Sequence, residues 1–418
     1  MLDKTGTRQL AYVVHVDAIE PIEGKDRVEA AVIGGWKTMV RKNLFKPGDL
    51  GIYIEIDSKT PEKEPFEFLS KYHYKLKTQK FKQFYSQGLL MHPSDFGWTV
   101  RFDLSEGGFA YVVDKDGNQH VPGDESMFLT KQLGITYAVA DDNKRKAPSV
   151  DKYKKMAQRH PELFKKSAFR WLMKRNWGKK LLFVFFGKAQ DKKGGWPSWV
   201  VKTDEERVQN MPWVFEDSDW HDTDWIATEK IDGTSTTFTL KRGKFGKKEF
   251  YVCSRNVCFD TPAKAEKCFY ESNVYLEMAQ KYHAKDVLTM ILDTVPGLDF
   301  VTLQGETYGD GIQKRTYGLM NGEHRFMAFN LIYGLKNGER RRLNPCEMTN
   351  VLTNYGIPCV PIIAEIYKMP CDCDTLLLQA TDKSALDNEL REGIVFRDRK
   401  GERSFKAVSN EFLAKYHG

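Results

Sequence analysis

Short runs of alternating apolar and polar residues dominate the first sixty positions of the chain. Residues 10–22 (LAYVVHVDAIEPI) predict a strand that ends at Pro21, and residues 27–42 predict two strands separated by Gly34 and Gly35. Residues 46–58 (KPGDLGIYIEIDS) predict a turn and then a strand with apolar residues at alternate positions. Because several short strands occur without a long helix, we expect a small β-barrel here.

The next stretch, residues 74–91 (YKLKTQKFKQFYSQGLLM), alternates lysine with aromatic or apolar residues. A nucleic-acid groove has this pattern, because ammonium groups bind phosphates and rings stack on bases. A half-buried strand with a solvated lysine face has the same pattern, so both interpretations stay open. Under the first, the candidate contacts are Lys75, Lys77, Lys80 and Lys82. With the strands before it, this stretch fits an OB-type barrel best.

Residues 98–130 predict a further hairpin, with a turn at DKDGN (114–118). From Lys144 to Lys193 basic residues are frequent, acidic ones are rare, and the apolar spacing is helical. The apolar anchors are Phe164, Phe169, Trp171, Leu172 and Trp177. We expect a basic, largely helical connector between two domains. A face that contacts phosphates and an ordinary solvated face explain its charge equally well.

The remaining residues predict one α+β domain. Strand-like runs occur at 224–231, 234–242, 248–255, 300–308, 325–333, 392–398 and 404–409, and a helical stretch lies at roughly 262–293. Turns at 241–249 (KRGKFGKKE) and 397–403 (RDRKGER) join neighbouring strands, which favours antiparallel or mixed sheets with helices over βαβ units. The predicted domains are thus 1–130 (OB-type), 131–195 (connector) and 196–418.

Composition agrees with this division and narrows the functional class. The chain has 418 residues, enough for two or three domains, and its net charge of +7 suits a polyanionic partner such as nucleic acid. The longest apolar run, LLFVFFG (181–187), is far shorter than the roughly 20 residues that span a bilayer. No secretory segment precedes the seven cysteines, so we expect reduced thiols in a cytoplasmic protein. The CDCD stretch at 371–374 is either a metal site or a loop.

A possible nucleophile lies at residues 229–233 (EKIDG), where Lys230 stands two residues before Asp232. Alone, this match also fits a surface lysine in a hairpin. Further polar or aromatic residues follow at strand positions in a fixed order. They are Arg255, Glu306, Phe329, Glu392 and Lys406. Each alone fits a surface charge or a core aromatic residue, so the prediction depends on the whole ordered set.

This ordered set resembles the covalent nucleotidyltransferase superfamily of ATP-dependent ligases and RNA-capping enzymes. GETYGDGIQK (305–314) and FMAFN (326–330) look most like the RNA ligases. Residues 19–58 and KTDEERVQN (202–210) resemble the branch that has an N-terminal OB domain. The resemblance covers about residues 8–95 and 196–416, and it leaves out the connector and the 98–130 hairpin. It implies a C-terminal nucleotidyltransferase domain of the ATP-grasp-like ligase type.

The residue types suit lysyl-adenylate chemistry. A neutral lysine amine can attack the α-phosphorus of ATP and release pyrophosphate. Lys406 or a divalent cation would lower the pKa of Lys230 and offset charge in the transition state. The resemblance implies Mg²⁺ or Mn²⁺ on Asp232 and Glu392. It also implies a nucleotide site formed by Glu229, Ile231, Gly233, Arg255, Glu306, Phe329, Glu392 and Lys314.

Three further contacts with RNA or the nucleotide are expected, from Lys202, Arg207 and Gln313, with Gln209 as an additional contributor. For residues 202–210 a helix N-terminus, with Thr203 as its cap and Glu205 and Glu206 in the first turn, explains the sequence as well. One position departs from the family pattern. Many relatives carry a second lysine two residues after the one that matches Lys406, and here that residue is Val408.

The chain ends at Gly418, soon after the strand at 404–409, where DNA ligases and capping enzymes usually continue into another OB domain. The resemblance therefore favours a monomeric ATP-dependent RNA ligase that acts on 3′-hydroxyl and 5′-phosphate ends, with a nicked duplex as the expected substrate. A DNA ligase, a GTP-using capping enzyme and a non-catalytic nucleic-acid-binding protein are the alternatives. The complete set of lysines and carboxylates argues against the last of these.

Overall fold

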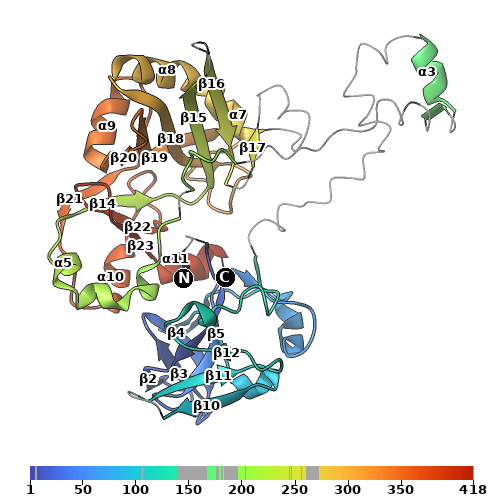
Figure 1. Ribbon diagram of the computed structural model, residues 1–418, viewed down its shortest axis with the longest axis vertical. Helices are drawn as coiled ribbons and strands as arrows, with labels where there is room; N and C mark the ends of the chain where they lie inside the picture. Colours follow the sequence, from blue (N-terminus) through green and yellow to red (C-terminus); the bar gives the residue numbers. More distant parts are fainter. Residues whose placement is uncertain are drawn as a thin grey trace.

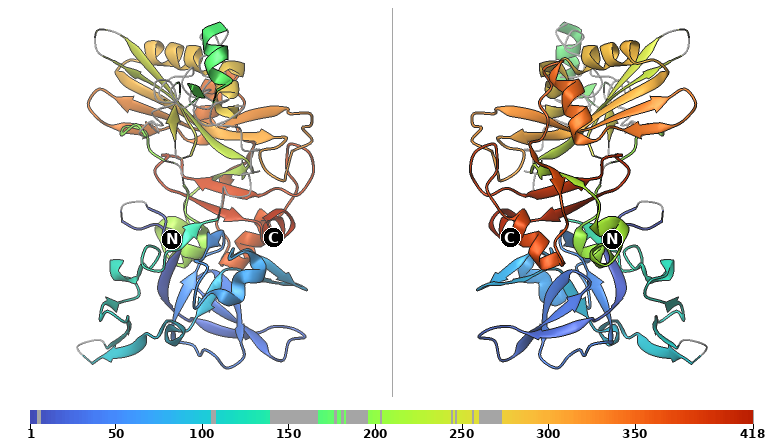
Figure 2. Two further views of the ribbon diagram at one scale, coloured as in Figure 1. Left: turned by 90° about the vertical axis from the view of Figure 1, so that its right-hand side faces the viewer. Right: turned by 90° about the vertical axis from the view of Figure 1, so that its left-hand side faces the viewer.

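A computed structural model describes residues 1–4, 7–104, 108–138, 167–175, 178–179, 182, 196–202, 204–243, 245, 247–255, 257–259 and 273–417. Three β-rich parts are stacked along the long axis of the molecule (Figure 1). The N-terminal domain lies at one end, a four-stranded sheet lies in the middle, and a six-stranded sheet lies at the other end. Both chain termini lie where the N-terminal domain meets the four-stranded sheet (Figures 1 and 2).

The N-terminal domain consists of short antiparallel sheets around one apolar core. The sheets are β1 (Ala11–His15), β5 (Leu50–Ile54) and β9 (Leu89–Met91); β2 (Ala18–Pro21), β3 (Val28–Ile33) and β4 (Trp36–Arg41); β6 (Ser58–Lys59) and β13 (Thr136–Tyr137); β7 (Gln79–Phe81) and β8 (Phe84–Ser86); and β10 (Thr99–Asp103), β11 (Phe109–Val113) and β12 (Gln119–His120). Single 3₁₀ turns lie at Glu67–Tyr72, Pro93–Phe96 and Glu125–Met127. The core includes the fully buried rings of Trp36, Tyr12 and Tyr53.

Most of the predicted N-terminal strands form, but the first one is split. The single strand predicted over 10–22 is wrong, because β1 pairs with β5 whereas β2 pairs with β3. The chain changes sheets at Val16 and Asp17, whose N–H groups donate to Asp49 and Val32. The break at Gly34–Gly35 is confirmed, and so is the turn at 114–118 between β11 and β12. Residues 74–91 form three short strands rather than one long alternating one.

The C-terminal domain contains two antiparallel sheets. The six-stranded sheet has the order β17 (Cys258–Phe259), β16 (Lys248–Cys253), β15 (Thr234–Arg242), β18 (Leu298–Gly309), β19 (His324–Leu335) and β20 (Arg340–Arg342). The four-stranded sheet has the order β21 (Ile362–Tyr367), β14 (Trp225–Lys230), β22 (Gly393–Arg397) and β23 (Ser404–Val408). All seven strand-like runs of the sequence are found as strands, and the α+β class is confirmed.

Helices cover these sheets and provide their apolar cores. The helices α7 (Val274–Lys281), α8 (Ala284–Thr294) and α9 (Pro345–Thr353) pack on the six-stranded sheet. On the four-stranded sheet lie α5 (Ser218–His221), α10 (Cys373–Ala380) and 3₁₀ turns at Val208–Asn210 and Pro212–Phe215. The predicted helical stretch at 262–293 is therefore two helices, and its first residues, up to 272, lie outside the described residues.

Part of the connector can be compared with its prediction. Ile135 belongs to the core of the N-terminal domain, and β13 pairs with β6, so the described residues up to 138 continue that domain. The helix α3 (Ser167–Met173) contains the predicted anchors Phe169, Trp171 and Leu172. The anchors Phe164 and Trp177 lie outside the described residues. In the part of the chain that the structure describes, no helix is long and apolar enough to cross a membrane.

The N-terminal domain and the four-stranded sheet share an interface along β23. Val408 is only 1% exposed and belongs to the apolar core of the N-terminal domain. Leu413 belongs to the same core; it lies in the π-helical turn Leu413–His417, which follows α11 (Asn410–Phe412). Beside β23 runs the segment 204–207: the Lys406 N–H donates to the Glu206 carbonyl at 2.8 Å. Trp36 Nε1 donates to Asn210 Oδ1 at 2.6 Å. The two domains are thus joined by apolar packing and by hydrogen bonds.

Candidate active site

The predicted nucleophile lies at the seam between the two sheets of the C-terminal domain. Lys230 is the last residue of β14 and stands opposite Gly393 of β22. Asp232 follows in the loop that enters β15, and β15 pairs with β18 so that Ser235 stands opposite Glu306. Residues from both sheets therefore surround one lysine.

The Lys230 ammonium group forms an ion pair with Glu392, the residue just before β22. Nζ lies 2.7 Å from Oε1 of Glu392, and a quarter of the lysine side chain (25%) is exposed. Burial lowers the pKa of Lys230, but the carboxylates of Glu392, Glu306 and Asp232 together outweigh burial and raise it. The lysine is therefore protonated in this arrangement and must lose a proton before it can attack an electrophile.

Two carboxylate oxygens beside Lys230 have no hydrogen-bond partner within the described residues: Oδ2 of Asp232 and Oε2 of Glu392. The former lies 3.4 Å from Nε2 of His417, within ion-pair distance only. Buried oxygens without partners are costly, and carboxylate oxygens are the ligands that Mg²⁺ and Mn²⁺ prefer. The described residues contain no group of three or more His, Cys, Asp or Glu side chains that could hold a metal. A cation here would therefore complete its shell with water or substrate oxygens.

Glu306 is the third carboxylate near Lys230. Burial raises the pKa of Glu306 to about 8. The positive charge of Lys230 lowers this pKa, whereas the negative charges of Glu392 and Asp232 raise it further. Its carboxyl group therefore carries a proton at neutral pH and can donate a hydrogen bond as well as accept one.

A second group of charges lies on the side of the site that faces the N-terminal domain. Lys406 Nζ lies 3.0 Å from Oδ1 of Asp204. The other oxygen of Asp204, Oδ2, lies 3.1 Å from Arg8 Nε and 3.2 Å from an Arg255 guanidinium nitrogen. Burial lowers the pKa of Lys406 to about 8, and the nearby cations Arg8, Arg207 and Lys230 act in the same direction. One carboxylate thus connects three cations from separate parts of the chain.

Gly233 and Gln313 fix the loop after the nucleophile. A Cβ atom on Gly233 would lie 2.3 Å from the Thr307 carbonyl oxygen, so the loop approaches β18 more closely than any other residue allows. Gln313 Nε2 donates to the Gly233 carbonyl at 3.0 Å, and the Tyr317 hydroxyl accepts the Asp232 N–H at 2.7 Å. Lys314, beside Gln313, is exposed. The predicted Gln313 contact is thus with the chain itself.

Three predicted nucleotide contacts have different surroundings. Ile231 is buried in a small apolar cluster, and Phe329 is partly exposed and packs against that cluster, so its ring borders the site. The Glu229 side chain is 2% exposed and accepts hydrogen bonds from the Ser384 hydroxyl and the Ala385 N–H. Because neighbouring side chains in a strand point to opposite faces, Glu229 points away from Lys230. The carboxylate of Glu229 is thus used within the chain, and a contact of this residue with the nucleotide stays a prediction.

The predicted nucleic-acid contacts differ in exposure. Arg207 is 7% exposed and pairs with Asp57 at 3.1 Å, so it is a contact between the two domains. Lys202 is exposed, and its Nζ lies 5.4 Å from the Trp196 ring centre. In the N-terminal domain Lys75 and Lys77 are partly buried, and Lys80 and Lys82 are exposed. Gln209 is buried, and neither polar atom of its side chain has a partner among the described residues.

The helix N-terminus considered for residues 202–210 does not form as expected, because the first helical residue there is Val208. Thr203, its expected cap, lies outside the described residues. Four residues at the site were not predicted: Arg8, Asp204, Tyr317 and His417. Of these, Asp204 lies in the segment KTDEERVQN (202–210), which resembles the family, but Lys202, Arg207 and Gln209 were predicted there instead.

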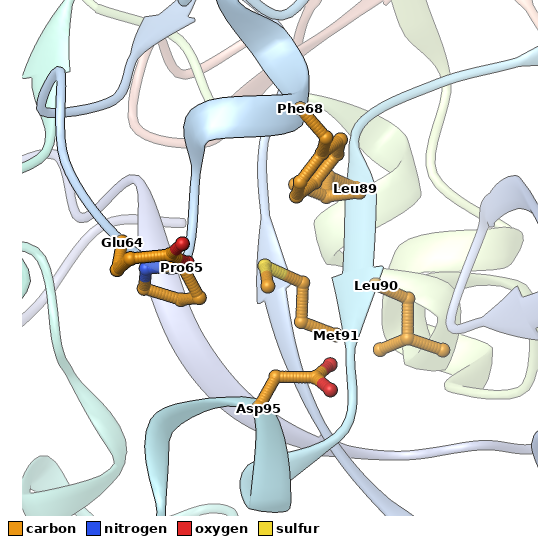
Figure 3. Close-up of a pocket in the computed structure, with 7 residues that line it drawn as sticks. All are labelled: Glu64, Pro65, Phe68, Leu89, Leu90, Met91 and Asp95. Atoms are coloured by element: carbon orange, nitrogen blue, oxygen red, sulfur yellow. The ribbon is translucent and has the colours of Figure 1, made fainter.

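A separate hollow of about 400 Å³ lies on the N-terminal domain (Figure 3). Five of its seven lining residues are apolar, and the other two, Glu64 and Asp95, are acidic. Acidic lining residues disfavour a polyanion, so this hollow does not suit a nucleotide triphosphate.

Comparison with known proteins supports the division of the chain. The family described as RNA ligase matches residues 223–417, and an OB-fold domain family matches residues 10–93. No curated protein sequence matches the chain.

Among solved structures, the chain is similar to mutants of an RNA ligase from Naegleria gruberi. One, solved with ATP and Mn, is 25% identical, with a TM-score of 0.67 and coverage of 98% of this chain and 99% of that one. Another, also with ATP and Mn, is 24% identical, with a TM-score of 0.66 and 98% of both chains covered. A third, with AMP and Mn, is 23% identical, with a TM-score of 0.65 and coverage of 98% and 99%. The likeness therefore extends across both domains.

Proposed function

Because residues 223–417 form a domain of the RNA ligase family, we propose that this chain is an ATP-dependent RNA ligase that works through a lysyl-adenylate. In the first step the Lys230 amine attacks the α-phosphorus of ATP, a phosphoramidate bond forms, and pyrophosphate leaves. The AMP then passes to the 5′-phosphate of an RNA end. In the last step a 3′-hydroxyl attacks that activated end, the phosphodiester forms, and AMP leaves.

One observation carries this proposal: four separate segments bring Lys230, Asp232, Glu306, Glu392 and Lys406 to one place. Lys230 lies within the electrostatic influence of Asp232, Glu306 and Glu392, and Lys406 lies within that of Lys230. A surface lysine in a hairpin would not be surrounded by three carboxylates and a second buried lysine.

Each group has a role in the proposed reaction. Asp232 and Glu392 would hold Mg²⁺ or Mn²⁺, which supplies positive charge for phosphoryl transfer. Their oxygens would then no longer stabilise the ammonium form of Lys230, so its pKa would fall and its amine would become available. Lys406 would bind phosphate, Phe329 would border the adenine, and Glu306 would bind the ribose hydroxyls.

For the RNA we propose a nicked duplex, gripped by a single copy of the chain. The exposed Lys80 and Lys82 of the N-terminal domain and Lys202 and Lys314 near the site are the proposed phosphate contacts. Their exposure leaves their ammonium groups accessible to a polyanion. Sealing of a nicked duplex should therefore be faster than joining of single strands, when equal concentrations of 5′-phosphate ends are supplied.

The decisive experiment is covalent labelling. Protein is mixed with α-³²P-ATP and Mg²⁺ and separated on a denaturing gel, with Lys230→Ala as the test variant. Lys241→Ala is the control, because Lys241 lies on β15 and pairs with Asp299 away from the site. We expect a labelled band that only Lys230→Ala removes. A band with labelled GTP would indicate a capping enzyme instead, and no band from folded protein with either metal would reject the covalent mechanism.

A further inference from the structure

Asp204 occupies an unusual position in the site described above. Its Oδ1 accepts from Lys406 at 3.0 Å, and its Oδ2 accepts from Arg8 at 3.1 Å and from Arg255 at 3.2 Å. These cations come from β23, from the N-terminal domain and from the turn after β16. Burial works in the opposite direction, but the three cations hold the pKa of Asp204 well below its usual range. The carboxylate is therefore an anion at any pH near neutral.

The three cations do not depend on Asp204 equally. Arg8 also pairs with Glu55 at 3.0 Å and with Glu206 at 3.6 Å. For Lys406 and Arg255, by contrast, Asp204 is the only carboxylate within ion-pair distance among the described residues. The proposed function assigns Lys406 to phosphate, and the family resemblance implies that Arg255 also belongs to the nucleotide site. Asp204 thus neutralises the groups that a phosphate would need.

Two contacts hold the residues that follow Asp204. The Lys406 N–H donates to the Glu206 carbonyl at 2.8 Å, and Glu205 pairs with Arg397 at 2.6 Å. These contacts place the Asp204 carboxylate beside β23 without using its own oxygens. The side chain can therefore turn away without breaking these two contacts, but the segment then loses the three ion pairs of Asp204 and opens more easily.

We propose that Asp204 competes with the phosphates of the nucleotide for Lys406 and Arg255, and that ATP displaces its carboxylate on binding. This proposal rests on the proposed function of the site. A carboxylate offers one negative charge, whereas a polyphosphate offers several, so only a highly charged ligand recovers the lost ion pairs. Asp204 thereby acts as a specificity-determining residue that favours a polyphosphate nucleotide over a ligand with little charge.

The test compares three probes by calorimetry in the presence of EDTA: adenosine, inorganic pyrophosphate and ATP. We expect Asp204→Asn to bind pyrophosphate and ATP about fivefold to twentyfold more tightly than the wild type, and adenosine with unchanged affinity. A merely structural role would alter the affinity for all three probes. The expected split between adenosine and pyrophosphate is therefore specific to competition for the cations.

Asp293→Asn is the matched control. Asp293 is also a carboxylate between two cations, Arg242 and Lys248, but it lies at the far end of β15 and β16 from Lys230. Its substitution changes the net charge by the same amount, and we expect no change in pyrophosphate affinity. If both variants bind pyrophosphate more tightly to the same extent, net charge explains the effect and the proposal fails.

A measurement on the wild-type protein covers the case in which Asp204→Asn does not fold. Amide hydrogen exchange of peptides that cover residues 204–207 should become faster with saturating pyrophosphate, because the Asp204 side chain no longer anchors them. Slower exchange there, or weaker pyrophosphate binding by Asp204→Asn with unchanged adenosine binding, would overturn the proposal and leave the ligase function intact. Failure of the wild type to bind adenosine or ATP at all would instead count against the proposed function.

Discussion

Val408 shows how one residue can exclude a feature that many relatives have. It stands two positions after Lys406, on the same face of β23, where those relatives carry a second lysine. In this structure it is 1% exposed and packs into the core of the N-terminal domain. An ammonium group at this place would be buried in an apolar core, so a second phosphate-binding lysine does not fit here.

Val408→Lys should therefore destabilise the protein, by about 3 kcal/mol, because it buries an unpaired charge and disturbs apolar packing. Thermal unfolding followed by circular dichroism measures the change. Ile366→Lys is the control, since Ile366 is 59% exposed, and its unfolding temperature should stay close to that of the wild type. A Val408→Lys protein as stable as the wild type, with faster adenylate formation, would show that the position accepts a lysine.

Glu306 makes the stability of the protein depend on pH. Its pKa is about 8 in the folded chain, against 4.5 for an ordinary glutamate, so between these values the folded state binds a proton that the unfolded state has lost. The free energy of unfolding therefore falls as pH rises from about 5 to 8. Glutamine cannot titrate. The stability of Glu306→Gln relative to the wild type should rise over this range by about 1 to 3 kcal/mol and then level off.

Urea unfolding at pH 5, 7 and 9 measures this difference. Glu249→Gln is the control for the loss of a glutamate carboxylate, because Glu249 is exposed on β16. A constant difference for Glu306→Gln would show that Glu306 titrates like an ordinary glutamate.

At the scale of single residues, the sequence indicates the chemistry better than the contacts. Lys230, Glu306, Glu392 and Lys406 lie at strand positions in an order that predicts a shared site, and the structure brings them together. Asp204 could not be selected in this way, because its importance depends on three cations that are distant in the sequence. For the same reason the sequence did not reveal that neighbouring backbone and hydroxyl groups already occupy the Glu229 carboxylate.

At the scale of elements, apolar alternation locates strands but does not say which sheet they join. Residues 10–22 read as one strand because nothing in their pattern changes at Val16, where the chain passes from one sheet to another. By contrast, all seven strand-like runs predicted in the C-terminal domain form strands, although β17, β20 and β21 were not predicted. The 3₁₀ turns of three to six residues were not predicted, because such short segments do not show a helical periodicity of apolar residues.

Gly233 couples two elements, because β15 can begin beside β18 only if residue 233 has no side chain. Gly233→Ala should push the loop off the Thr307 carbonyl and move Asp232 relative to Glu306. We expect a loss of adenylate labelling of about a hundredfold or more, since small displacements of reacting groups are costly.

Gly48→Ala is the control. Gly48 has a φ of +89° and open space around it, so its substitution should cost about 1 kcal/mol of stability and leave labelling unchanged. Equal labelling of the two variants would contradict this account of Gly233.

At the scale of the whole molecule, the two domains are held together by groups that neither can satisfy alone. Asn210 of the C-terminal part accepts hydrogen bonds from Trp36 and Tyr12 and donates one to Glu55. Glu55 is 1% exposed and also pairs with Arg8. Separation would expose these polar groups together with the apolar surface around Val408. The interface is therefore part of the fold and is more than a contact between independent modules.

Residues 196–418 expressed alone should accordingly aggregate or unfold at a much lower temperature than the full chain. Residues 1–138 supplied on a second plasmid should restore a soluble complex, because the interface uses residues from these two ranges and needs no covalent link between them. Co-purification through a tag on one half, followed by adenylate labelling of the complex, measures the rescue.

Asp57→Asn in the N-terminal half should weaken the complex, since Asp57 pairs with Arg207 across the interface. Glu62→Gln, at an exposed position, should leave the complex unchanged. If residues 196–418 alone unfolded at the same temperature as the full chain and formed the adenylate equally fast, the N-terminal domain would be a separable attachment. The cation cluster on Asp204, which includes Arg8, would then not be needed to build the site.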